Sequence, residues 1–135
     1  MAPHLMVVLS NARPWQDEEF NRWYSDVHMI ETIDKLEGFA SAQRFQLADL
    51  DAAPPCPYRY LAIYEIPGDQ LDTAYAQFRW QRQERAAALA DGRDPVVSVS
   101  DTLDPDPFLV GFFTTITDQV PSSRRSSSPA EAAGP

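Results

Sequence analysis

The chain has 135 residues, of which 44% are hydrophobic and 11% aromatic, a composition typical of one globular domain with its own core. Its 20 acidic residues outnumber its 11 basic residues, and the formal charge of -9 repels a phosphate backbone, so we expect no nucleic-acid partner. Cys56 is the only cysteine, which excludes an intramolecular disulfide and a thiolate metal cage.

The single cysteine also favours a reducing compartment. The opening segment "MAPHLMVVLSNARP" has no basic leader, and no stretch approaches the roughly 20 apolar residues of a membrane span. We therefore expect a cytoplasmic protein without a membrane partner.

Hydrophobic patterning predicts six elements in chain order. Strands are expected at 5–11, 39–47, 58–66 and 108–117, and helices at 14–37 and 69–90. Gly38 and Gly92 close the two helices, and the proline-rich segment 48–57 forms a loop. Residues 96–99 are expected to add a short strand extension.

This order of elements is typical of the ferredoxin-like α+β fold, βαββαβ, in which two helices cover one face of a four-stranded antiparallel sheet. We expect residues 1–118 to form this domain. Residues 119–135 have little to bury and are expected to form a disordered tail.

Both faces of the predicted sheet are apolar. In the strand at 58–66, Tyr60 and Tyr64 alternate with Leu61 and Ile63, and the first and last strands alternate in the same way. Two helices cover only one face, and soluble monomers rarely expose an apolar patch larger than roughly a few hundred Å². We therefore expect a homodimer whose sheets pack face to face around an aromatic-lined space, with a plain aromatic interface as the alternative.

The segment 18–39, "EEFNRWYSDVHMIETIDKLEGF", places a histidine beside the apolar stripe of the first helix. Glu31 and Asp34 fall on that stripe where a purely structural helix would carry apolar residues. His28 lies four residues after Tyr24 and three before Glu31, so the three side chains are neighbours on a helix. The stripe itself is expected to contain Phe20, Trp23, Tyr24, Val27 and Ile30.

A tyrosine, a histidine and a glutamate at this spacing are suited to proton transfer. The imidazole has an ordinary pKa near 6.5, and a neighbouring carboxylate fixes its tautomer and strengthens it as a base. In the structural alternative, His28 caps the helix edge, Glu31 pairs with Lys35, and Asp34 is exposed.

The stretch "EEFNRWYSDVHMIETIDKLEGFASAQRFQL" resembles the first helix and second strand of the EthD-like branch of the dimeric α/β-barrel superfamily. Beyond these residues, 18–47, only the order of elements agrees, over roughly residues 4–118. A proline common in the family shortly after the histidine is absent from the segment Met29-Ile30-Glu31. The matching positions are Phe20, Trp23, Tyr24, His28, Gly38, Phe39 and Arg44.

The resemblance implies a homodimer with a lumen between sheet and helices, acting without a metal or an organic cofactor. It also implies dehydration, decarboxylation, cyclisation or isomerisation of an aromatic or polyketide-like small molecule, with a histidine at position 28 as acid or base. A cofactor-free monooxygenase and a non-catalytic ligand-binding dimer are the alternatives. The predicted catalytic residues are His28, Glu31 and Tyr24, and the predicted substrate-binding residues are Trp23, Tyr60, Tyr64, Arg44 and Asp34.

Metal binding has little support, because the chain has only two histidines and no ligand spacing of a known type. A triad of His4, His28 and a carboxylate is the remaining possibility for a metal. Arg79, Arg82 and Arg85 recur at i, i+3 and i+6 on the second helix and are interpreted as a solvated face. One of them, or Arg44, is also suited to hold a substrate carboxylate through two hydrogen bonds.

Overall fold

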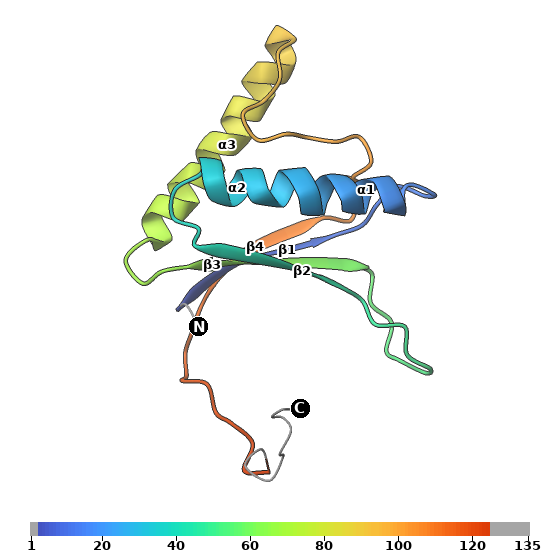
Figure 1. Cartoon of the computed structure of the whole chain (residues 1–135), viewed down its shortest axis with the longest axis vertical. Coiled ribbons are helices and arrows are strands. Elements are labelled where there is room, and N and C mark those ends of the chain that lie inside the picture. The colour runs from blue at the N-terminus through green and yellow to red at the C-terminus, as the bar shows by residue number, and fades with distance from the viewer. Residues whose placement is uncertain (1–2, 125–135) are drawn as a thin grey trace.

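The computed structural model describes residues 3–124, in which all helices pack on one face of a four-stranded sheet (Figure 1). The strands run in the order β2-β3-β1-β4, and every neighbouring pair is antiparallel. This arrangement confirms the predicted ferredoxin-like α+β fold. The strands are β1 (His4–Ser10), β2 (Ser41–Gln46), β3 (Tyr60–Ile66) and β4 (Leu109–Thr114).

The helical layer consists of two long helices. The first is continuous through α1 (Asp17–Trp23), the π-helical turn η1 (Tyr24–His28) and α2 (Met29–Lys35), and the second is α3 (Leu71–Asp91). Three acidic residues in the first turn of α1 complement the positive end of its dipole. The first helix ends at Lys35, two residues before the predicted position 37, because Leu36 adopts an extended conformation.

The chain between α3 and β4 is a long loop that returns across the first helix (Figure 1). The predicted strand extension at 96–99 is wrong, because this segment forms no ladder. The backbone of Ser98 instead bonds side chains of the first helix.

The core lies between the sheet and the helices. Alternate residues of β3 are buried, and Tyr64 and Ile66 are at most 1% exposed. Phe20 of α1 and Val97 of the return loop are also almost fully buried, so helix, sheet and loop share one core.

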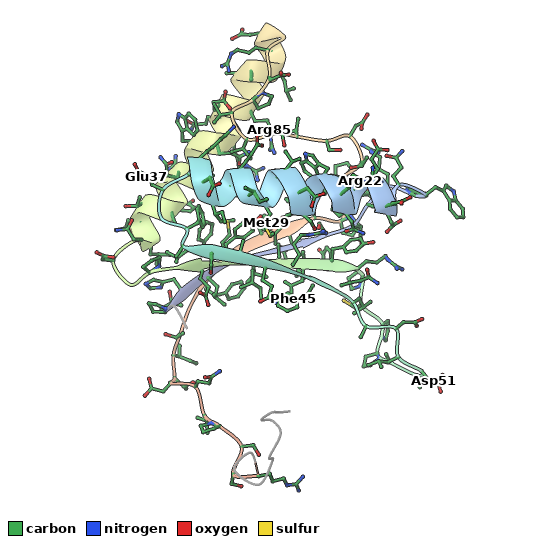
Figure 2. The ribbon with its side chains drawn as sticks, viewed as in Figure 1. Arg22, Met29, Glu37, Phe45, Asp51 and Arg85 are labelled. Atoms are coloured by element: carbon green, nitrogen blue, oxygen red, sulfur yellow. The ribbon has the colours of Figure 1, made fainter. Side chains whose placement is uncertain are left out.

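The opposite face of the sheet is apolar and open. Its central residues from β1 and β3 are only partly buried, and none of the helices in residues 3–124 covers them. Phe45 on β2 points away from the helices and is 42% exposed, while Leu109 and Phe113 on β4 are 51% and 57% exposed (Figure 2). The prediction of two apolar sheet faces is therefore confirmed.

The C-terminal segment and the hydrophobicity of the helices bear on the predicted tail and on membrane binding. The predicted disordered tail falls mostly outside the described residues, which end at position 124, and residues 119–124 are exposed and irregular. Among residues 3–124, none of the helices combines the length and the hydrophobicity needed to cross a membrane.

The close packing of the helical layer is expected to require glycine at position 38. It has a φ of +100°, and a Cβ atom there would lie 2.7 Å from the backbone of the fully buried Ala74 in α3. We expect Gly38→Ala to lower the free energy of unfolding by about 2–4 kcal/mol, because backbone strain adds to overpacking. Chemical denaturation at constant pH measures the loss.

Gly92 provides the matched control. It also has a positive φ, +72°, but a Cβ atom would meet nothing within 4 Å. Gly92→Ala should therefore cost only the strain, about 1 kcal/mol. Equal losses for the two variants would show that the close approach of Gly38 to α3 does not matter.

Candidate active site

The π-helical turn determines where His28 points. A turn with i→i+5 bonding inserts one residue relative to an α-helix, so the side chains that follow are rotated by about 100°. The predicted straight stripe is wrong beyond Tyr24, because Val27 and Ile30 are 40% and 44% exposed and Asp34 also faces solvent. Thr32, one turn after His28, is buried instead.

His28 lies in the wall of a cavity of about 540 Å³ between the sheet and the helices. The first helix contributes Trp23, Tyr24 and His28, and β3 contributes Tyr64. Further walls come from α3, from the return loop after it, and from β1 and β4. A cavity of this volume suits a small organic molecule.

Ser98 ties the return loop to the first helix through three hydrogen bonds. Its carbonyl accepts a hydrogen bond from His28 Nδ1 at 3.0 Å, and its N–H donates to Glu31 Oε1 at 2.7 Å. Its hydroxyl accepts from Trp23 Nε1 at 2.9 Å. Because a carbonyl only accepts, Nδ1 carries the proton of the neutral imidazole, and Nε2 keeps its lone pair.

The surroundings of His28 favour the neutral imidazole. The ring stacks on Trp23 with centroids 4.6 Å apart and meets the Tyr24 ring edge-on at 4.9 Å. Burial lowers the pKa of His28 to about 4, against the opposing effects of the Ser98 carbonyl and Glu31, with Arg85 lowering it further. Nε2 is therefore unprotonated at neutral pH and makes no hydrogen bond within residues 3–124.

Glu31 acts on the imidazole indirectly. Its carboxylate bonds the Ser98 N–H and accepts a hydrogen bond from Lys35 Nζ at 3.2 Å. Burial raises the pKa of Glu31, but the hydrogen bonds from Ser98 and Lys35 outweigh burial and hold the pKa below its ordinary value. Glu31 thus holds Ser98, the loop residue whose carbonyl accepts the hydrogen bond from His28. The predicted i, i+4 pair of Glu31 with Lys35 is also present.

Two tyrosine hydroxyls meet at the base of the cavity. Tyr64 donates a hydrogen bond to the Tyr24 hydroxyl over 3.4 Å, and both residues are buried. Burial raises the pKa of each hydroxyl. At neutral pH both are therefore phenols, able to donate hydrogen bonds but not to act as bases.

Arg44 and Tyr60, predicted to bind substrate, are not among the residues that line this cavity. The Arg44 guanidinium lies 4.4 Å from the centroid of the Tyr24 ring and donates to Asn21 Oδ1 at 2.9 Å. The Tyr60 hydroxyl donates to Asp17 at 2.6 Å and accepts a hydrogen bond from Asn21. Both residues brace the first helix against the sheet behind the cavity, which is why they do not reach it. Asp34, also predicted to bind substrate, is exposed and outside the cavity lining.

His4 is also distant from the cavity lining. Its ring contacts the Thr114 hydroxyl at 3.0 Å and the Gly68 carbonyl at 3.2 Å, at the start of the central strand β1. Within the described residues 3–124, no group of three histidine, cysteine, aspartate or glutamate side chains is placed to hold a metal ion. The alternative triad that joins His4 to His28 is therefore wrong.

Two residues of the site, Ser98 and Gln81, did not emerge from the sequence as site residues. Ser98 lies 70 positions from His28 and has no local motif. Gln81 on α3 is only 7% exposed and lines the cavity, although nothing in its local sequence marks it as special. Arg85 also lines the cavity, whereas the periodic arginines of α3 were interpreted as a solvated face, with a role in holding a substrate carboxylate as the alternative.

Comparisons with known proteins agree with the fold. No protein-family model and no curated protein sequence matches the chain. An EthD-like protein from Ralstonia eutropha JMP134 is 12% identical, with a TM-score of 0.51 over 88% of this chain and 97% of that one. A candidate monooxygenase from Shewanella loihica PV-4 is 17% identical, with a TM-score of 0.48 over 87% and 98%.

At these identities the likeness shows the fold alone. The chain therefore has a ferredoxin-like fold of the kind found in dimeric α/β barrels. The resemblance of the first helix and second strand to the EthD-like branch agrees with the structural similarity to an EthD-like protein.

Protonation of His28 is expected to couple stability to pH. The folded-state pKa of about 4 lies below the ordinary value of 6.5, so between these values the unfolded chain binds a proton that the folded chain does not. Stability is therefore fully present above pH 6.5 and falls as the pH drops, by at most about 1.4 kcal/mol per pH unit.

The comparison is between the native protein and His28→Gln, followed by chemical denaturation from pH 7.5 to pH 4. We expect the stability difference between the two proteins to shrink steadily below pH 6.5 by up to about 3 kcal/mol. A difference that stays constant over this range would mean that the folded protein holds His28 at its ordinary pKa.

Proposed function

We propose that the protein is a cofactor-independent lyase, cyclase or isomerase that moves a proton through His28 on an aromatic or polyketide-like small molecule. The observation that carries this proposal is a neutral imidazole in a cavity wall, held at Nδ1 by Ser98 and unbonded at Nε2. Such a group is a positioned general base.

The proposed step begins at a carbon acid next to a carbonyl group. Nε2 of His28 takes the proton, and the electron pair of the C–H bond becomes the π bond of an enolate. The enolate then expels a hydroxyl group or attacks a second carbonyl, and the proton on Nε2 returns to the departing or newly formed oxygen. Dehydration and cyclisation are thus two outcomes of one proton transfer.

The two buried phenols support this step. Tyr24 and Tyr64 line the same cavity as His28, and their raised pKa values keep their protons on them at neutral pH. A phenol that donates a hydrogen bond to the substrate carbonyl stabilises the negative charge that develops on the enolate oxygen. Trp23 provides an aromatic wall against which a planar substrate can stack.

The assay that tests this function uses, as candidate substrates, the intermediates of whatever pathway the genes next to its own gene encode. We expect His28→Ala to lower the rate by about 10²- to 10⁴-fold, the usual range for removal of a general base. Glu31→Gln should lower the rate less, because Glu31 acts through Ser98. Asp34→Asn, a matched change at an exposed position of the same helix, should leave the rate unchanged.

Near-native turnover by His28→Ala would place the chemistry on another residue. Oxygen consumption that matches product formation would identify a cofactor-free monooxygenase, which begins with the same deprotonation. Ligand binding without any turnover would identify a non-catalytic binding protein.

We also propose that a second copy of the chain covers the open face of the sheet. Phe113 supports this assembly, because it is an aromatic residue 57% exposed on the face that carries Leu5 and Phe45. A face of this kind is rarely left in water by a soluble protein. A two-fold pair of sheets would cover it in both copies.

Sedimentation at micromolar concentration should give a mass near twice the 15.2 kDa of the chain. Phe113→Glu should shift the protein toward the monomer, because it places a charge in the proposed interface. Ile116→Glu, at a position 96% exposed just beyond β4, should leave the dimer intact. A native protein that sediments as a monomer would refute the assembly.

A further inference from the structure

The α3 wall of the cavity carries polar groups without partners. Gln81 and Arg85 lie one helical turn apart and both line the cavity. Gln81 is only 7% exposed and Arg85 is half-buried, yet neither side chain makes a hydrogen bond or an ion pair within residues 3–124. Figure 2 shows Arg85 on α3 beside the first helix. A buried amide and a half-buried cation that face a cavity are groups that a ligand can satisfy.

The charges around Arg85 leave it without an acidic neighbour. Burial lowers the pKa of Arg85, and Arg82, three residues earlier and also in the cavity lining, lowers it further. Glu84 is occupied by Arg93 at 2.7 Å and by the Val96 N–H. Asp101 lines the cavity too, but it forms no ion pair with either arginine in the described chain.

This arrangement is unusual in a chain with a net charge of -9, since acidic residues are plentiful elsewhere. The half-buried Arg85 and the exposed Arg82 repel each other, and an anion that approaches them relieves this repulsion. The guanidinium of Arg85 matches the two oxygens of a carboxylate, and the Gln81 amide can donate a further hydrogen bond.

We propose that Gln81 and Arg85 form a binding site for the carboxylate of an aromatic or polyketide-like acid, with Arg82 adding positive charge beside it. This inference rests on the proposed function in one respect, because it identifies the bound acid with the substrate of that reaction. The site anchors the acid on α3 and leaves its carbon skeleton between the aromatic walls, within the same cavity as His28.

A permanent carboxylate is favoured over an enolate oxygen that appears only during the reaction. Repulsion between Arg82 and Arg85 exists before any chemistry, and only a charge carried by the ligand throughout binding relieves it. The inference therefore concerns affinity. A charge that appears only in the transition state would leave affinity unchanged and would alter kcat.

The test compares two probes of the same shape, 2-naphthoate and its neutral amide 2-naphthamide, by calorimetry on the full chain. We expect the native protein to bind the naphthoate more tightly. Arg85→Gln should weaken naphthoate binding by about 10- to 100-fold, the loss expected for hydrogen bonds to a charged group, and should leave naphthamide binding unchanged. Gln81→Leu should weaken naphthoate binding less, because a neutral donor is lost.

Arg79→Gln is the matched control. It removes the same charge from α3, but Arg79 is exposed and lies outside the cavity lining, against the Tyr75 ring. It should leave both affinities unchanged. Circular dichroism of each variant verifies that the helix remains folded.

Four results would overturn the carboxylate site. The first two concern the native protein: equal affinity for the two probes, or no naphthoate binding at millimolar concentration. The third is an equal loss of naphthoate affinity in Arg79→Gln and Arg85→Gln. The fourth is a change in kcat of Arg85→Gln without a change in its affinity. His28→Ala should still bind naphthoate. The binding measurements therefore test the carboxylate site, and the turnover of His28→Ala tests the proton transfer separately.

Discussion

The convergence of three hydrogen bonds on Ser98 is the constraint on which the rest of the site depends. Backbone hydrogen bonds of Thr102 and Asp104 hold the later part of the return loop to residues 11–13. The bonds that Trp23, His28 and Glu31 make to Ser98 hold its middle part against the first helix, where it lines the cavity. The same bonds fix the tautomer of the imidazole. The orientation of the base is therefore coupled to the position of Ser98 in the cavity wall, since a displacement of Ser98 would remove the acceptor that holds the histidine.

The fold could be predicted because it follows from alternation and element order. Short apolar runs with period-two alternation, as in β1 and β3, and turn residues between the elements specify the strands and helices, and these features are local. The position of His28 beside Tyr24 could be predicted for the same reason. The rotation of His28 toward the cavity could not be predicted. It follows from the extra residue in the π-helical turn η1, and no distinctive sequence pattern marks such a turn.

The positions of Arg44 and Tyr60 outside the cavity lining could not be predicted for a related reason. Arg44 and Tyr60 have the chemistry of ligand-binding residues, but their partners, Asn21 and Asp17, come from a different part of the chain and hold them behind the cavity. The state of Arg85 also depends on the tertiary structure, since the acidic side chains near it in space are set by the fold, and Glu84 pairs with Arg93, which lies beyond the end of α3. Pairing between charges far apart in sequence is a tertiary property that periodicity does not encode.

The two sides of the cavity are linked through charge. Arg85 is one of the groups that lower the pKa of His28, so an anion bound at Arg85 would cancel part of that effect and raise the pKa of the imidazole. The base would then be weak in the empty cavity and stronger once an acid is anchored on α3. A carboxylate site on α3 would thus do more than hold the substrate, because its occupation would prepare the proton acceptor across the same cavity for the ligand that has just bound.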